Sequence, residues 1–588
     1  MSPPRFLVVP ALEKRKGGGH LERSAFLTRS LREAGREAFL FLPESGREIP
    51  GAEVEPWTLR SDPRLGGAAD RNWDFIVLDK LRSSPEEASS WSALAPLIGI
   101  DEGGPMRNSF EFLIDLLPAP KRRFSNPPNM AAPSLLPLPL ARRPSFQTSG
   151  ASPRILVSFG AEDAAALGDS VVGALKKTAP TLKVDFARPG ALIPNLRERL
   201  AEYDLLITHF GLTAFEALHA RLPVLLVSPT RLHEALARNA GFFSLGVGRA
   251  AALRIGRHIS KPALLSSLGQ RCRNIAARHG LENPPEQSLG ELLADFEPPA
   301  FRECPGCGAP FPLAGTKGKT PGRFPERSYR RCGRCGLIYQ IRNRPGTISY
   351  ETDYFFDSYR QQYGKTYLED FPNLVEAGKK RIALIRRLLK GGTGRLLDIG
   401  CAYGPFLSAA RQEGFEPLGL DPAAGAARSV RDNLGIEALT GFFPGLFLRN
   451  PPEQGSFTVV TLWYVIEHFA DFRPALREIN RLLATKGALA FSTPSFSGIS
   501  GRKSLRAFLE NSPQDHNTVW TPALCGRLLA QYGFRVKKIR VTGHHPERFP
   551  LGSRLRRGGL LWNLLLLISR LFKLGDTFEC YAIKERSL

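Results

Sequence analysis

Short runs of apolar residues recur along the first 300 residues, and amphipathic helical patterns separate them. The first run, Arg5–Pro10, leads through a glycine-rich loop to a segment whose apolar positions repeat near the 3.6-residue helical period. Apolar strands that alternate with helices are typical of parallel sheets covered on both faces. This half is therefore predicted to form doubly wound α/β lobes, with strands at 5–10, 39–42, 75–78, 154–159, 205–208 and 224–227.

The same alternation returns in the last third of the chain. A strand at 396–400 runs into a glycine loop, and a helical pattern follows over 406–413. Further apolar runs predict strands at 417–421, 457–461 and 488–492. We therefore expect a Rossmann-like α/β domain here.

Two changes in composition divide the chain. Residues 121–153 are rich in Pro and Ser, which favours an extended linker, and Glu297-Pro298-Pro299 marks a second break. The predicted organisation is a lobe at 1–125, a linker at 126–153, a second lobe at 154–296, a small cysteine module at 300–345 and a C-terminal domain at 350–588.

An apolar segment near the C-terminus, Leu560–Phe572, contains Leu, Trp and Phe beside basic residues. Its longest uninterrupted apolar run is far below the ~20 residues that span a bilayer. We expect a helix that packs over the sheet before the final strand. The alternative is an interfacial amphipathic helix that contacts a membrane surface.

Composition narrows the class of protein only slightly. With 588 residues, 43% apolar and 23% charged, the chain is predicted to be globular and to contain several domains. The net charge of +24 would attract nucleic acid, an anionic membrane or phosphorylated metabolites, but the arginines are scattered rather than grouped in blocks. The N-terminal residues lack the pattern of a signal peptide, so we expect a cytoplasmic protein.

Four of the eight cysteines form two C-x-x-C pairs. Cys304 and Cys307 precede Cys332 and Cys335 by 24 intervening residues, and a glycine follows each pair. Four thiolates at this spacing predict a closed tetrahedral Zn²⁺ site with a structural role. A thioredoxin-like role would need only one pair, and iron–sulfur sites usually show a different spacing.

The loop after the strand at 396–400 carries the strongest candidate chemistry. Gly400 and Gly404 allow a sharp turn and close approach of a ligand, and a helix N-terminus follows. Asp421, at the end of the next strand, could accept hydrogen bonds from both ribose hydroxyls. The loop alone would equally fit a dinucleotide.

Together these motifs resemble the class I S-adenosylmethionine (SAM)-dependent methyltransferases. Their pattern hhDhGCGxGxhh corresponds to Leu396–Leu407, and their hhxhhEH turn to Tyr464–His468. Two departures are Ala402, where glycine is usual, and Thr458, where an acid is common. The resemblance implies SAM as cofactor, bound around Asp398, Gly400, Ala402, Gly404 and Asp421.

A cysteine module precedes this domain, and the aromatic and acidic stretch 350–356 follows the module. This arrangement resembles the branch of the methyltransferase family that methylates nucleotide-linked sugars for surface polysaccharides. This resemblance implies a sugar acceptor. We predict His468 as the general base, with Glu467 orienting it or sharing the work, and His516 as the second candidate base. Tyr464 would line the acceptor. In the alternative interpretation, His468 caps a helix and packs beside the cofactor.

The N-terminal half shows a weaker resemblance to the two-lobed GT-B nucleotide-sugar enzymes, especially the UDP-sugar hydrolases of nonulosonic-acid pathways. The matching segments are Gly17–Arg23, Asp79, Ile100–Glu102, Ile155–Asp163 and Gly211–Glu216. The resemblance implies that His20 activates water or assists departure at the diphosphate, and that the nucleotide sugar contacts a set of residues comprising Gly19, His20, Gly211, Thr213 and Glu216.

The N-terminal half also departs from that family, at Phe210, Ala161 and His233-Glu234. Lobes that bind a nucleotide sugar without turning it over therefore remain an open alternative.

Three hypotheses follow. The first is a bifunctional enzyme in which one half handles a nucleotide sugar and the other methylates a related sugar. The second is a nucleic-acid methyltransferase that uses the zinc module and basic surface to hold phosphate. The third is a methyltransferase with a non-catalytic N-terminal binding module.

Overall fold

The computed structural model describes most of the chain, in ranges separated by short gaps. Gly17, Gly18, Ala161 and the stretch 350–356 lie outside it. The described residues are 3–11, 19–43, 57–64, 72–118, 127–147, 153–160, 163, 165–259, 262–298, 303–310, 319–344, 360 and 364–588.

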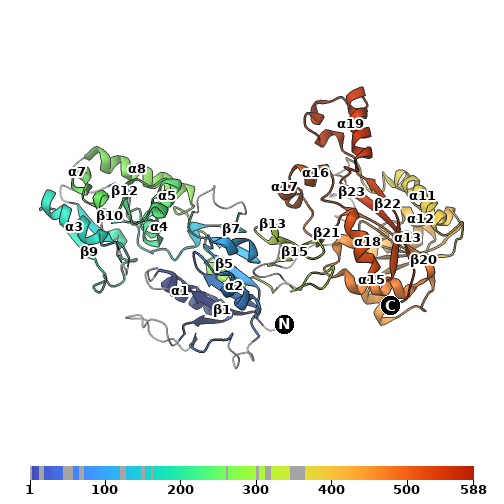
Figure 1. The fold of residues 1–588 in the computed structure, drawn as a ribbon, viewed down its shortest axis with the longest axis horizontal. Helices are drawn as coiled ribbons and strands as arrows, with labels where there is room; N and C mark the ends of the chain where they lie inside the picture. Colours follow the sequence, from blue (N-terminus) through green and yellow to red (C-terminus); the bar gives the residue numbers. More distant parts are fainter. Residues whose placement is uncertain are drawn as a thin grey trace.

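The first lobe is built on a parallel sheet of seven strands in the order β3-β2-β1-β4-β5-β6-β7 (Figure 1). Helix α1 (Gly19–Glu33) follows β1, as predicted, and α2 spans Pro85–Ser92. The strands are Arg5–Pro10, Glu37–Phe41, Thr58–Leu59, Phe75–Asp79, Leu97–Ile100, Phe112–Asp115 and Met130–Ala131. The last strand lies in the predicted linker, so that part of the linker belongs to the sheet rather than to an extended tether.

The second lobe contains a five-stranded parallel sheet in the order β12-β11-β10-β8-β9, again as predicted. Its strands are Arg154–Ser158, Lys183–Ala187, Leu205–Thr208, Val224–Ser228 and Ser244–Val247. Its helices are α3 (Leu167–Thr178), α4 (Leu212–His219), α5 (Arg231–Ala240), α6 (Arg249–Ala252), α7 (Ile255–Ile259) and α8 (Pro262–Arg278).

The end of the second lobe returns to the first. Helix α9 (Leu289–Ala294) packs against α1, and the hydroxyls of Ser30 and Ser288 lie 2.8 Å apart. Beyond α9, the ring of Phe296 packs between Phe75 and Phe112 in the core of the first lobe. The two lobes are therefore held together by packed side chains as well as by the chain connection.

A small antiparallel sheet, here called the ribbon sheet, lies between the N-terminal lobes and the C-terminal domain (Figure 1). Its strands β13 (Lys319–Phe324), β14 (Arg327–Arg331) and β15 (Ile338–Arg342) come from the cysteine module. The fourth strand, β21 (Thr518–Val519), belongs to the C-terminal domain and pairs with β15.

Buried polar contacts fasten the ribbon sheet to the first lobe. The Asn129 amide donates to the carbonyls of Phe324 and Arg327, and Arg323 donates to the carbonyls of Arg107 and Phe110. Because these groups are buried, their hydrogen bonds fix the position of the sheet against the lobe.

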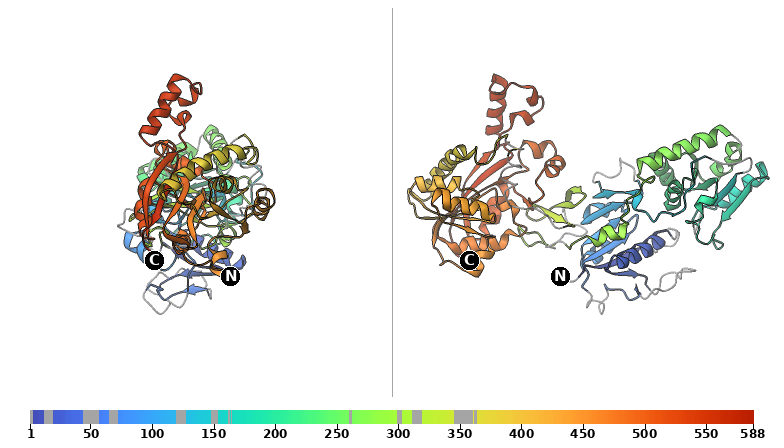
Figure 2. Two further views of the ribbon diagram at one scale, coloured as in Figure 1. Left: turned by 90° about the vertical axis from the view of Figure 1, so that its right-hand side faces the viewer. Right: turned by 180° about the vertical axis from the view of Figure 1, so that it is seen from behind.

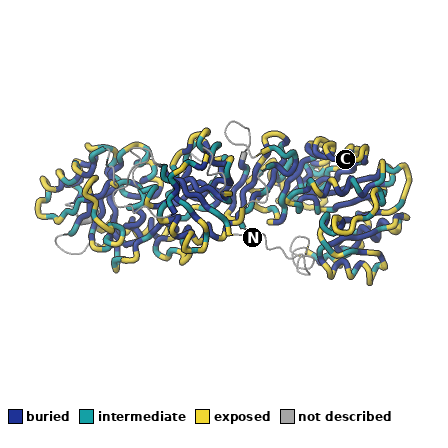
Figure 3. Tube along the Cα trace, turned by 90° about the horizontal axis from the view of Figure 1, so that it is seen from below, coloured by how far each residue is buried: buried dark blue, intermediate teal, exposed yellow. Residues whose placement is uncertain are grey.

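The C-terminal domain has a seven-stranded sheet in the order β18-β17-β16-β19-β20-β23-β22, in which only β23 is antiparallel to its neighbours. The strands are Arg395–Ile399 (β16), Glu416–Asp421 (β17), Ala438–Thr440 (β18), Phe457–Trp463 (β19), Leu483–Pro494 (β20), Phe534–Thr542 (β22) and Thr577–Lys584 (β23). The α-helices are α11 (Phe371–Leu388), α12 (Pro405–Gln412), α13 (Ala424–Leu434), α14 (Gly445–Arg449), α15 (Phe472–Leu482), α16 (Ile499–Lys503), α17 (Leu505–Glu510), α18 (Pro522–Ala530) and α19 (Leu560–Leu571). Buried residues lie toward the inside of each part of the molecule and exposed residues along its outside (Figure 3).

Helix α19 contradicts the expectation that this segment packs over the sheet. It stands in an excursion between β22 and β23 that rises away from the domain in two different views (Figures 1 and 2). Packing over a sheet would bury most of its leucines, but many are exposed. None of the described helices is long and apolar enough to cross a membrane.

Candidate functional site

The loop after β16 has the tight backbone that its glycines predict. Gly400 and Gly404 have φ angles of 75° and 77°, in the left-handed region that favours glycine. A side chain at Gly400 would also collide with Val465. Helix α12 begins directly after Gly404, so its first amides lie at the carboxyl edge of the sheet, beside the predicted cofactor loop.

Asp421 holds this loop in place. Its carboxylate accepts hydrogen bonds from the backbone amides of Ala402, at 2.8 Å, and Ala423, at 2.9 Å. Burial raises the pKa of Asp421, while the two amide bonds oppose the shift. The carboxylate therefore shapes the loop, besides its predicted role at a ribose.

Ala402, which stands where the family pattern has glycine, has a strained backbone conformation. Its φ is 49°, in the left-handed region, and its side chain is buried. A residue with a Cβ in this region costs roughly 1–2 kcal/mol. This cost gives a physical reason for the glycine that the family pattern has here.

Ala402→Gly is expected to raise the stability of this domain by about 1 kcal/mol, because it removes the left-handed strain. Thermal unfolding measures this change, in the transition whose midpoint temperature rises when SAM is added. Ala235→Gly is the matched control, since Ala235 is exposed within α5, where glycine should destabilise by about 1 kcal/mol. Destabilisation by both changes would contradict strain at Ala402.

Asp398 lies at the end of β16, below the loop. It is buried and accepts a hydrogen bond from the Thr461 hydroxyl at 2.6 Å. Burial raises the pKa of Asp398 to about 7, although the Thr461 bond opposes this. The side chain joins β16 to β19, so it supports the loop from beneath.

His468 lies against a carboxylate for which no role was predicted from the sequence. Its Nδ1 lies 2.8 Å from a carboxylate oxygen of Asp515, far along the chain. Burial lowers the pKa of His468, but the Asp515 bond and the charge of Glu467 outweigh it, so the net pKa is raised. Asp515 contacts the His468 ring directly, while Glu467 acts on it through its charge.

Glu467 and His516 complete the cluster. Glu467 is fully buried, and burial raises its pKa to about 7. The His516 ring meets that of His468 edge-on, with centroids 4.9 Å apart, and burial together with the charge of His468 lowers the pKa of His516 to about 3. Ligand atoms of Glu467, His468 and His516 lie within 4.8 Å of one another, so the three side chains could also hold a cation.

Two aromatic side chains lie beside the cofactor loop. Tyr403 belongs to the loop, while Tyr367 comes from the segment before α11, and their ring centroids are 6.1 Å apart. Both pack against the small apolar cluster that contains Ala402 and Ala423. Tyr367 belongs to no periodic pattern in the sequence, because it lies in a turn.

The ribbon sheet holds the turn that carries Asp515 and His516. The backbone amide of Gln340, on β15, donates to the carbonyl of Asn517 at 2.8 Å. The Asn517 side chain in turn donates to the carbonyl of His468, also at 2.8 Å. The cysteine module is thus connected by two hydrogen bonds to the histidine cluster.

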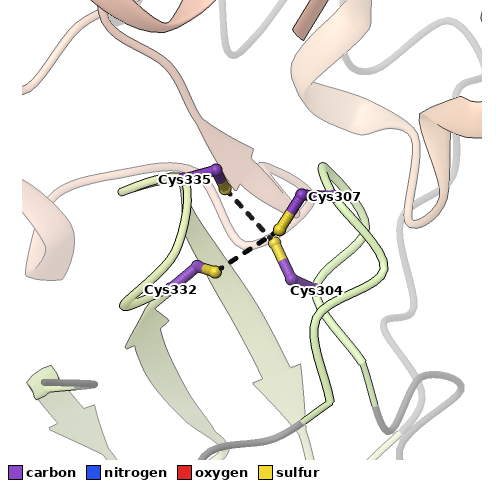
Figure 4. Close-up of side chains that lie close together, drawn as sticks. All are labelled: Cys304, Cys307, Cys332 and Cys335. Atoms are coloured by element: carbon purple, nitrogen blue, oxygen red, sulfur yellow. Dashed lines mark hydrogen bonds between the residues drawn. The ribbon is translucent and has the colours of Figure 1, made fainter. Parts of the chain in front are cut away.

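The four module cysteines converge as predicted (Figure 4). The sulfurs of Cys304 and Cys335 lie 3.6 Å apart, and those of Cys307 and Cys332 lie 3.7 Å apart. Tetrahedral Zn²⁺ with Zn–S bonds of about 2.3 Å would separate its sulfurs by about 3.8 Å. All eight cysteines are free thiols rather than disulfides, so this donor set fits a zinc ion.

The first lobe brings its predicted residues together. His20 Nδ1 lies 2.7 Å from Asp79, and buried Arg23 pairs with both Asp79 and Asp101. Burial raises the pKa of Asp79, but Arg23 and His20 outweigh it and hold that pKa below its usual range. Asp79 therefore orients His20 at the start of α1.

In the second lobe, Gly211 and Thr213 lie at the start of α4, as predicted. Glu216 is buried and accepts a hydrogen bond from Arg197 at 2.9 Å, and Arg197 also reaches Glu22 of the first lobe at 2.5 Å. A Cβ at Gly19 would lie 3.2 Å from Leu212, so the starts of α1 and α4 face each other.

Two of the residues that depart from the GT-B pattern lie against other rings. The Phe210 ring turns into the core, where it packs edge-on against Phe215 and Phe242. His233 lies beside His209, and burial together with that neighbour lowers the pKa of His233 to about 4. The Phe210 ring therefore does not obstruct the starts of α1 and α4.

Comparison with known proteins identifies part of the chain. Residues 369–539 match the family described as "Methyltransferase domain". No curated protein matches the chain.

Three solved methyltransferases are each similar to part of the chain. A SAM-dependent methyltransferase from Archaeoglobus fulgidus is 17% identical over 39% of this chain and 98% of that one, with a TM-score of 0.29. One from Mesorhizobium loti is 16% identical over 32% and 90%, with a TM-score of 0.24. Geranyl diphosphate C-methyltransferase from Streptomyces coelicolor is 16% identical over 35% and 79%, with a TM-score of 0.26. Scores this low say nothing about acceptor or mechanism.

The family match falls on the sheet that carries the glycine loop, Asp421 and the histidine cluster. It identifies residues 369–539 as a methyltransferase domain.

Proposed function

We propose that the methyltransferase domain methylates a sugar or a nucleotide-linked sugar in surface-glycan biosynthesis. We further propose that the N-terminal lobes bind or process a nucleotide sugar. The observation that carries the first part is the His468–Asp515 pair at the edge of the sheet where the cofactor loop also lies. The assignment of a sugar as the methyl acceptor rests on the family resemblance.

Methyl transfer is an in-line displacement at the methyl carbon of the sulfonium, which SAM supplies when bound. The chain must align the acceptor, exclude water and remove one proton. The Asp515 carboxylate, 2.8 Å from Nδ1 of His468, favours the proton on Nδ1 and so leaves the lone pair on Nε2. His468 therefore takes the acceptor proton at Nε2, and Asp515 stabilises the resulting positive charge.

In the first lobe, His20 is proposed to act as a base in a similar way. Its Nδ1 contacts Asp79, which orients the ring as a base toward water. The facing starts of α1 and α4 present backbone amides that suit a diphosphate. Zn²⁺ at the four cysteines would have a structural role, because four thiolates leave no open coordination position.

A mass-spectrometric screen of nucleotide sugars incubated with the protein and SAM tests the proposal. The expected result is a sugar product heavier by one CH₂ unit, together with S-adenosylhomocysteine. Methylation of RNA, in a reaction that rising salt suppresses, would instead favour the nucleic-acid alternative. Added Mg²⁺ should leave the rate unchanged if Glu467, His468 and His516 act without a cation.

His20→Ala is expected to lower nucleotide release from a UDP-sugar by about 10²-fold or more, because the water loses its base. His258→Ala, in the second lobe and outside the cluster, is the control. Binding of the nucleotide sugar without release by the unmodified protein would show that the lobes form a binding module only.

A further inference from the structure

We propose that helix α19 and the loop before it form a docking surface for an anionic lipid bilayer. The surface, here called the α19 face, comprises seven exposed apolar residues with five basic residues around them. The apolar members are Leu551, Leu560, Leu561, Leu564, Leu567, Leu571 and Phe572, and the basic members are Arg554, Arg556, Arg557, Arg570 and Lys573.

The apolar residues form a continuous stripe rather than scattered exceptions. Leu560, Leu564, Leu567 and Leu571 are spaced by four, three and four residues, which places them on one side of a helix. The seven apolar residues are between 50% and 89% exposed. Contiguous apolar surface of this kind marks an interaction site, whereas single exposed leucines do not.

The opposite side of α19 is already occupied by this chain. Trp562, Leu565 and Leu566 are partly buried on that side, and buried Ser569 bonds to the His544 ring at 2.8 Å. The helix also contacts η6 (Pro546–Arg548). The inner side therefore anchors the helix, and the outer stripe is left to a partner.

Charge decides which partner fits. The segment between Glu547 and Asp576 contains no acidic residue. Both flanking acids are paired within the chain, Glu547 with His545 and Asp576 with Arg548. An anionic bilayer offers an apolar phase beneath a layer of phosphates, which complements leucines bordered by arginines.

The length of α19 sets the geometry. Its 12 residues span about 18 Å, too short to cross the ~30 Å hydrocarbon core. The helix would therefore lie in the plane of the interface, with its leucines in the acyl boundary and its basic residues at the headgroups.

The α19 face also lies at the functional edge of the methyltransferase sheet. The excursion leaves β22 at Thr542 and returns to β23 at Thr577, at the carboxyl end of β22. Near its return, the Asp576 carbonyl accepts from the Ser495 amide at 2.8 Å, directly after β20. Docking would bring the edge that carries the cofactor loop toward the bilayer.

Vesicle flotation with the full chain tests the proposal. We expect the protein to float with phosphatidylcholine vesicles that contain phosphatidylglycerol, and to float far less with phosphatidylcholine alone. The triple variant L564S/L567S/L571S should abolish flotation. The variant R554Q/R556Q/R557Q should weaken partitioning by about ten-fold or more and reduce its dependence on salt.

The control variant L140S/L253S/L448S removes three leucines that lie elsewhere and are more than half exposed. It should float like the unmodified protein, and all variants should retain SAM affinity and bound zinc. Absence of flotation, or equal loss in the control, would overturn the proposal. A dimer that L564S/L567S/L571S converts to a monomer, without vesicle binding by the unmodified protein, would assign the α19 face to a second copy instead.

Discussion

His468→Ala is expected to lower kcat for methyl transfer by about 10²–10⁴-fold, the contribution typical of a positioned general base. The affinity for SAM, measured by calorimetry, should stay unchanged, because the cofactor loop is held by Asp421 rather than by His468. His468 is preferred over His516 because the raised pKa of His468 makes it the stronger base, whereas the pKa of His516 is about 3.

Asp515→Asn provides the matched positioning variant. Without the carboxylate, the pKa of His468 should fall, since the Asp515 bond and charge raise it. The base must be neutral to accept a proton, so the acidic limb of the pH–rate profile should move to lower pH. Normal turnover by His468→Ala, with loss of turnover in His516→Ala, would instead assign the base to His516.

Cys332→Ser/Cys335→Ser is expected to remove bound zinc and to unfold the ribbon sheet. Structural zinc in small modules contributes on the order of 10 kcal/mol to folding. Methyl transfer should be lost as well, because β15 pairs with β21 and bonds to Asn517, which in turn bonds to His468. Elemental analysis, thermal unfolding and the methylation assay measure the three effects.

Cys272→Ala is the control, because Cys272 is a buried thiol in the second lobe, outside the tetrad. It should retain full zinc content and lose only the modest stability of a small core truncation. A purified protein without zinc, or a tetrad variant with full methylation, would contradict the proposed connection.

The strands could be predicted from sequence wherever apolar runs were long. The strands β1, β4, β16 and β17 lie within one or two residues of the predicted bounds. The two-residue strands β7 and β21 could not be predicted, because two residues show no period and their pairing depends on tertiary contacts.

Some of the contacts between site residues could be predicted from the sequence, and others could not. Convergence of His20, Arg23, Asp79 and Asp101 follows from the rule that residues at the carboxyl ends of parallel strands meet at one edge. The pairing of His468 with Asp515 could not be anticipated, since it depends on a turn that the ribbon sheet holds. The sequence of α19 predicts a helix, but the face of that helix that the chain itself covers depends on the tertiary fold.

The strand shared between the ribbon sheet and the methyltransferase domain has a practical consequence. A cut in the chain near residue 345 would look like a clean boundary between modules, yet it would strip β15 from β21. The C-terminal fragment would then carry an unpaired strand edge, a known cause of aggregation. The smallest fragment worth expressing therefore starts before Cys304, and the catalytic unit and the zinc module should be regarded as a single folding unit.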